Sequence, residues 1–114
     1  MIAVIFEVLP RDGCKAAYLA TAAALRVHLD HIDGFISIER FQSLTDPARL
    51  LSLSFWRDEA SVHQWRQLEE HRRAQRAGRN DLFADYRLRV AHVLRDYGLA
   101  ARDEAPADSR ALHG

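Results

Sequence analysis

The fold is decided by residues 35–57, FISIERFQSLTDPARLLSLSFWR, where two alternating segments flank a short polar turn. The first segment, 35–44, places Phe35, Ser37, Glu39, Phe41 and Ser43 on one face and Ile36, Ile38, Arg40, Gln42 and Leu44 on the other. The second, 49–57, sets Leu51, Leu53 and Phe55 against Ser52, Ser54 and Trp56. Residues 45–48, TDPA, carry proline at a central turn position. The pattern predicts an antiparallel β-hairpin.

The segments on either side of this hairpin predict two helices and two further strands. Residues 2–9 are β-branched and aromatic and predict a first strand. Residues 83–97 alternate, with Tyr86, Leu88 and Val90 opposite Arg87 and Arg89, and predict a long last strand. Residues 14–31 have apolar side chains at helical spacing and end before Asp33-Gly34. A second helix is expected from 58 to about 78, with Asp58 as its N-cap. The order is that of a ferredoxin-like α+β sandwich with an antiparallel sheet.

Such a fold covers only one face of the sheet with helices. The other face is too apolar and aromatic here to remain in water, although it also carries serines and arginines. The simplest cover is the same face of a second copy, related by a two-fold axis. We therefore expect a homodimer.

Composition excludes several classes of partner. The 114 residues include 16 Lys and Arg and 16 Asp and Glu, so the formal net charge is zero, which argues against nucleic-acid and membrane-surface binding. The single cysteine, Cys14, rules out an internal disulfide, and no histidine pair has convincing metal-ligand spacing, so we expect no metal. With no signal-peptide pattern and no membrane span, we expect a cytoplasmic protein. Residues 1–98 are expected to form the domain, and 99–114 a disordered tail.

Several stretches together resemble the antibiotic biosynthesis monooxygenase family, a group of dimeric α/β-barrel proteins. They are GFISIERFQSL from Gly34, LSLSFWRDEASVHQW over 51–65, EHRRAQRAGR over 70–79 and FADYRLRVAHVLRDYG over 83–98. The resemblance covers nearly all of the chain from Ile2 to Gly98. It is fairly specific for the fold and poorly specific for the reaction, because this scaffold hosts different chemistries.

The resemblance implies an oxygenase-type site with Trp65 and His71 as its catalytic residues. In cofactor-independent members, an electron-rich substrate anion reacts with oxygen in a dry aromatic pocket. His71 would act as the base or anion partner, since its imidazole titrates near neutrality. Trp65 matches a tryptophan of the family's cleft, but the same side chain on an amphipathic helix also fits the core. His71 also fits an ordinary surface histidine.

Five further residues are candidates for substrate binding. They are Tyr86, Trp56, Arg87, Glu39 and Gln75. The aromatic pair could line the cleft or the dimer interface, and the charged pair, with Glu7 and Arg89, could act as base or anion clamp or form interface ion pairs. Gln75 lies four residues after His71 and shares its helix face.

The chain departs from the family's known subgroups at three positions. Haem-degrading members carry an asparagine on the first strand and a histidine ten residues after the tryptophan, where this chain has Glu7 and Gln75. Phenol-oxidising members carry an asparagine four residues before the tryptophan, where this chain has Ser61. We expect a cofactor-independent monooxygenase-like protein for a small aromatic or polycyclic substrate. The alternatives are a haem-binding or haem-degrading protein and a non-catalytic small-molecule-binding dimer.

Overall fold

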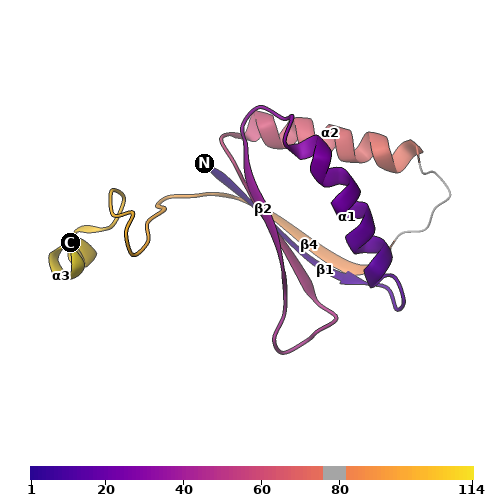
Figure 1. The fold of residues 1–114 in the computed structure, drawn as a ribbon, viewed down its shortest axis with the longest axis horizontal. Coiled ribbons are helices and arrows are strands. Elements are labelled where there is room, and N and C mark those ends of the chain that lie inside the picture. The colour runs from indigo at the N-terminus through magenta and orange to yellow at the C-terminus, as the bar shows by residue number, and fades with distance from the viewer. Residues whose placement is uncertain (76–81) are drawn as a thin grey trace.

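The computed structural model describes the backbone of residues 1–75 and 82–114, and the side chains of 1–68 and 82–114. Its elements are β1 (Ile2–Pro10), α1 (Lys15–Leu29), β2 (Phe35–Gln42), β3 (Leu50–Trp56), α2 (Glu59–Gln75), β4 (Phe83–His92) and α3 (Ala107–His113). The strands form one sheet in the order β2-β3-β1-β4, with every neighbouring pair antiparallel. Helices α1 and α2 lie on the same side of it (Figure 1). The predicted ferredoxin-like α+β fold is confirmed.

The side of the sheet under the helices holds the core. One cluster joins Ile2, Val4, Leu29, Trp56 and Val62, with Ile32, Phe35, Ile38 and Trp65 packed against it. A second cluster, toward the other end of the helix layer, joins Val8, Tyr18 and Leu50 with Phe6, Leu82 and Phe83. We call this side the helix side and the opposite side the open side.

The hairpin β2–β3 is present, but the faces predicted for β2 are partly wrong. The pairing of β2 with β3 shifts between Phe35 and Ser37, as at a β-bulge. Because of this extra residue, Phe35 and Ile38 both pack on the helix-side core instead of lying on opposite faces. In β3 the prediction is confirmed: Ser52, Ser54 and Trp56 are buried, and the alternate residues are partly exposed.

Strand β4 is shorter than expected. Alternation predicted a strand to residue 97, whereas β4 ends at His92. The reason lies in the partner: His92 pairs with Ile2, and one further hydrogen bond joins the Val93 N–H to the Met1 carbonyl. The ladder between β1 and β4 therefore ends at the first residue of β1.

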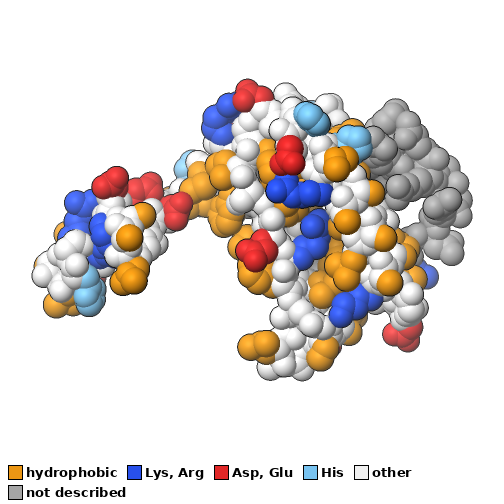
Figure 2. Space-filling view, in the orientation of Figure 1, with side chains coloured by type: hydrophobic (Ala, Val, Ile, Leu, Met, Phe, Trp, Pro, Cys, Tyr) orange, Lys and Arg blue, Asp and Glu red, His pale blue; other side chains and the backbone are white. Residues whose placement is uncertain are grey.

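Residues 93–114 leave the sheet and stand away from it, in a molecule that measures 56 × 35 × 20 Å (Figure 1). The expected disordered tail contains helix α3. Arg102 organises the segment, since its guanidinium donates to the carbonyls of Gly98 and Gly114 and to Ser109 Oγ. Figure 2 shows a separate lobe with hydrophobic side chains on its surface, and Leu99 and Leu112 are among those exposed. The domain boundary at residue 98 stays a prediction.

In the part of the chain that is described, no helix is both long and apolar enough to span a membrane.

Candidate functional site

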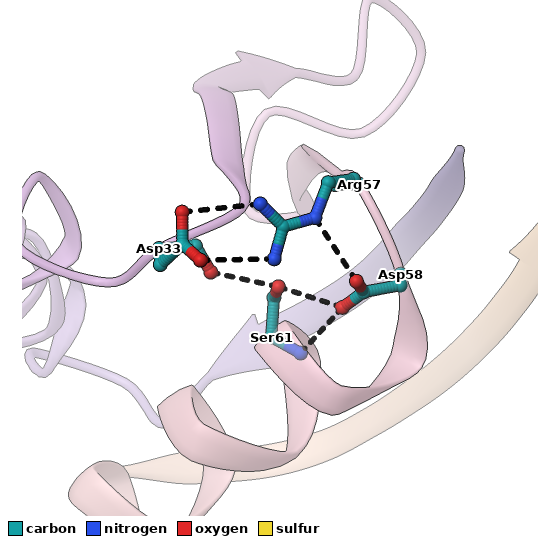
Figure 3. A network of polar contacts seen from close by, with 4 residues as sticks. All are labelled: Asp33, Arg57, Asp58 and Ser61. Atoms are coloured by element: carbon teal, nitrogen blue, oxygen red, sulfur yellow. Dashed lines mark hydrogen bonds and ion pairs between the residues drawn. The ribbon is translucent and has the colours of Figure 1, made fainter.

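The turns that enter β2 and α2 are tied together by a polar network (Figure 3). The Arg57 guanidinium donates to both carboxylate oxygens of Asp33 at 3.1 Å and, through Nε, to Asp58 at 3.0 Å. Asp58 caps α2 as predicted, because its Oδ1 accepts the Ser61 N–H at 2.9 Å. The Ser61 hydroxyl lies 2.8 Å from both Asp58 Oδ1 and the Asp33 carbonyl, so its single proton is shared between two acceptors.

Gly34 lies directly against this network. Its φ is +95°, and a Cβ built there would lie 2.0 Å from Ser61 Oγ. Ser61 therefore has a structural role here: it is buried and its hydroxyl is engaged at the start of α2. Two of the segments that carry the family resemblance, Gly34-Phe35 and residues 54–58, therefore lie next to each other here.

The network lowers the pKa of both carboxyl groups. The pKa of Asp58 falls from 3.8 to about 2, first because of the Ser61 N–H and then because of the Ser61 hydroxyl and Arg57. The pKa of Asp33 is lowered mainly by its hydrogen bonds from Arg57. Both carboxylates thus prefer the charged form in the folded chain.

Acid should therefore weaken the fold. The unfolded chain takes up the Asp58 proton near pH 3.8, while the folded chain resists until about pH 2, so this contribution is complete above about pH 5 and is lost as the pH falls. We expect the thermal midpoint to drop between pH 5 and 2, and to drop less steeply in Asp58→Asn. An equally steep fall in that variant would show that Asp58 is not responsible. Asp12→Asn, an exposed turn residue, is the control.

Trp65 and Trp56 meet on the helix side. Their ring centroids are 5.7 Å apart, and Trp56 also packs edge-on against Phe35 at 5.1 Å. Trp56 is fully buried, and its Nε1–H donates to Ser54 Oγ at 2.9 Å. Trp65 is only partly buried. Trp56 is thus a core residue that supports Trp65, which has one side packed and one side accessible.

Tyr86 belongs to the same side of the sheet but to its other end. Its ring lies 5.7 Å from that of Phe6 and 5.9 Å from that of Phe83. Leu88 and Val90 follow it on the helix side of β4, since they pair with Phe6 and Val4 of the two clusters. All three remain exposed, at 57%, 42% and 49%. Tyr86, Leu88 and Val90, which we call the β4 strip, form an apolar surface on this side of the sheet.

Arg87 and Glu39 lie on the opposite side of the sheet from the aromatic clusters. Arg87 pairs with Glu7, and Glu39 pairs with Leu53, all on the open side. There Glu7 forms an ion pair with Arg89 at 3.1 Å. The sheet itself separates both candidates from Trp65.

A cation that the sequence analysis did not single out lies on the helix side instead. Arg40 pairs with buried Ser52, which pairs in turn with Phe6. Its Nε is buried and has no hydrogen-bond partner among the described residues. The alternation of β2 placed Arg40 opposite Glu39, but it could not show which of the two faces the helices.

Two hollows are lined by described residues, both on the open side near the end of β1. The larger, about 230 Å³, includes Phe41, Leu51 and Arg49 in its lining, and the smaller, about 60 Å³, includes Arg87 and Tyr86. Both are below the 300–1,000 Å³ usual for ligand pockets. Glu7 and Arg49 line both of them, and no sequence pattern had marked Arg49. No group of three described metal-ligating side chains could hold an ion.

A family model described as "Antibiotic biosynthesis monooxygenase" matches residues 1–77. The chain belongs to the antibiotic biosynthesis monooxygenase family. A curated relative from Pyricularia oryzae, "Jasmonate monooxygenase ABM", is 48% identical over 93 residues, which are 82% of this chain and 43% of that protein. The chain thus spans less than half of this relative. The resemblance read from the sequence is confirmed.

Solved structures of the family share the fold. Rv0793 from Mycobacterium tuberculosis superposes with a TM-score of 0.70 at 21% identity, over 85% of this chain and 98% of its own. A protein from Deinococcus radiodurans assigned to the same family reaches 0.71 at 13% identity, over 86% and 97%. MhuD with manganese protoporphyrin IX bound reaches 0.62 at 18% identity, over 86% and 99%. At these identities the likeness concerns the fold alone.

His71 and Gln75 lie in the last turns of α2, and their side chains fall outside the described residues. Their roles therefore stay predictions. Glu7, which stands where haem-degrading members of the family carry asparagine, points to the open side, away from α2. Among the described residues, the position of that asparagine is thus held by a carboxylate on the other side of the sheet from α2.

Proposed function

We propose that this chain is a monooxygenase that oxidises a small, largely apolar molecule with O₂ and without a bound cofactor. The observation that carries the proposal is the 48% identity over 93 residues with a jasmonate monooxygenase. Jasmonate is a non-aromatic carboxylate, so the substrate class is wider than the aromatic and polycyclic molecules suggested by the sequence. Activity as a homodimer belongs to the same proposal.

The helix side supports this proposal better than the open side. It presents the β4 strip and the accessible side of Trp65 as apolar surface for a ring or an alkyl chain. Arg40 on the same side offers a guanidinium for a carboxylate or phenolate. A cation beside a bound substrate favours the anionic form, which is the form that gives up electrons to oxygen.

The electron balance separates two versions of the reaction. When a CH₂ group is oxidised to a carbonyl, the substrate supplies all four electrons that reduce O₂. One oxygen atom enters the carbonyl and the other leaves as water. Hydroxylation of a C–H bond takes only two electrons from the substrate, so a soluble reductant must supply the other two. We propose the first version, in which His71 takes a proton from the neutral substrate and the resulting anion is the only electron donor.

Oxygen uptake tests the proposal. Purified protein is supplied with phenols, quinols and jasmonate, with and without a reduced nicotinamide. We expect turnover without reductant for at least one electron-rich substrate, and a loss of about 100-fold or more in kcat/KM in His71→Ala. His63→Ala, an exposed histidine of the same helix, is the matched control. Arg40→Gln should raise KM for anionic substrates more than for neutral ones.

The other outcomes decide between the alternatives. Uptake that needs a reductant would replace the first version with hydroxylation. A one-to-one Soret shift on haem titration that disappears in His71→Ala would favour the haem-binding reading. Tight binding of a small molecule with no oxygen uptake would leave a non-catalytic binding protein.

A further inference from the structure

The segment that follows β4 carries large apolar side chains that are open to water. Leu94, Leu99 and Leu112 are each exposed by at least 80%. A single exposed leucine needs no explanation. Three of them on one short segment, which stands away from the sheet with hydrophobic side chains on its surface, point to a contact that the described arrangement leaves unmade (Figure 2).

Most of this segment forms one body, residues 96–114, which we call the C-terminal lobe. Its first residue is held to its middle, because the Asp96 N–H donates to Glu104 at 2.9 Å. Its last residue is held as well, because Arg102 Nε donates to the Gly114 carbonyl at 2.7 Å. The lobe can therefore change its position without losing its own hydrogen bonds.

A short hinge joins the lobe to the sheet. The ladder side of the hinge is fixed at Val93, whose N–H donates to the Met1 carbonyl at 3.0 Å. Between Val93 and the lobe, Leu94 and Arg95 make no backbone hydrogen bond with any described residue. Rotation at a few such residues is how hinges move one body against another.

The β4 strip is the apolar surface nearest to this hinge along the chain, and its three residues are about half exposed. The proposed dimer would cover the open side of the sheet and would leave the strip as it is. The proposed reaction forms a substrate anion, and exclusion of water protects such a species from side reactions. The proposed site therefore needs one more apolar wall.

We propose that the C-terminal lobe closes over the β4 strip of its own chain and that Leu99 and Leu112 contact the substrate there. This inference rests on the proposed substrate site and adds the wall that it needs. The arrangement in Figure 1 is then the open form, which admits substrate. Because the lobe is tethered, closure is an intramolecular step with a high effective concentration.

The position of the hinge sets which residues meet. When the chain reverses at Leu94 and Arg95, Leu99, four residues after the hinge, returns to the level of Val90, four residues before it. The rest of the lobe then lies over the remainder of the strip, toward Tyr86.

The chemistry of β4 favours the helix side for this closure. On that side Leu99 comes to apolar Val90, whereas the open side of the same strand carries Arg87 and Arg89. Contact between apolar side chains removes both from water, which is favourable. Contact of a leucine with an arginine would instead cover part of a charged group.

Disulfide trapping tests the closure directly in the whole chain. The natural thiol is first removed by Cys14→Ser. Leu99→Cys is then combined with Val90→Cys on the helix side, or with Arg89→Cys on the open side as the matched control. Under copper phenanthroline at low protein concentration, the first pair should form a disulfide within one chain about 10-fold faster than the second or more, because this bond demands close approach.

Kinetics test the contact with substrate. The double variant Leu99→Ser/Leu112→Ser should raise KM for the substrate by about 10-fold or more, with a smaller change in kcat, because an apolar wall of the site is lost. Both leucines are exposed in the open form, so the substitutions leave the core unchanged. Leu44→Ser, at a fully exposed leucine of the β2–β3 turn, is the matched control.

Every outcome bears on the proposal. Equal trapping of the two cysteine pairs would overturn closure on the helix side, and disulfides between chains would show that the lobe covers another copy, which also overturns it. An unchanged KM in the double serine variant would overturn the contact with substrate. Trapping needs no turnover, so a trapped lobe in a chain without oxygen uptake would defeat the proposed reaction and leave the closure standing.

Discussion

Replacement of Gly34 by alanine should lower the free energy of unfolding by about 3 kcal/mol or more, because two unfavourable terms add. The backbone has φ +95°, where an L side chain is strained. The new Cβ would lie 2.0 Å from Ser61 Oγ and 2.9 Å from Ser61 Cβ, closer than real contacts allow. Ser61 cannot turn aside without giving up its hydrogen bonds to the Asp33 carbonyl and Asp58. Urea unfolding measures the loss.

Gly13 provides the matched control. It also has positive φ, +77°, but a Cβ there meets nothing within 4 Å. Gly13→Ala should cost only the backbone strain of about 1–2 kcal/mol. Ser61→Gly in the Gly34→Ala background removes both clashing atoms and should recover part of the difference. Equal losses for the two glycine variants would refute the close approach of Gly34 to Ser61.

The alternation of apolar and polar side chains predicted where the strands lie. It failed at positions where the conformation or the length of a strand is set by the strand beside it. In β3 the faces are correct because the ladder is regular from Leu50 to Trp56. In β2 a bulge after Phe35 reverses the faces for one part of the strand, and no residue type in 35–38 announces it. In β4 the alternating pattern continues to residue 97, but pairing stops where β1 begins.

For the candidate site, the sequence predicted which residues share a strand face but not which face lies under the helices. Trp65 and Trp56 lie together, as a helix stripe above a strand face allows. Alternation also grouped Tyr86 with Leu88 and Val90 and set them against Arg87. It could not show that the first group lies on the helix side of the sheet, whereas Arg87 and Glu39 lie on the open side. Because the sequence did not show which face of β2 lies under the helices, it also did not mark Arg40 as a candidate.

Trp56→Ala should be the most destabilising single change in the core, at about 3–5 kcal/mol. Trp56 is fully buried between Phe35 and Trp65, and its removal also leaves Ser54 Oγ without its donor in a buried position. Trp56→Phe keeps most of the apolar volume and should lose less than half as much. Thermal and urea unfolding of both variants measure the difference.

Comparison with Trp65→Ala separates support of the fold from contact with substrate. Trp65 is only partly buried, so its truncation should cost roughly half as much stability as that of Trp56. If Trp65 walls the substrate site, however, its variant should lose more of the oxygen uptake than the less stable Trp56→Ala. If instead the loss of turnover follows the loss of stability across the three variants, Trp65 belongs to the core alone, and the apolar surface that binds substrate lies nearer to Tyr86.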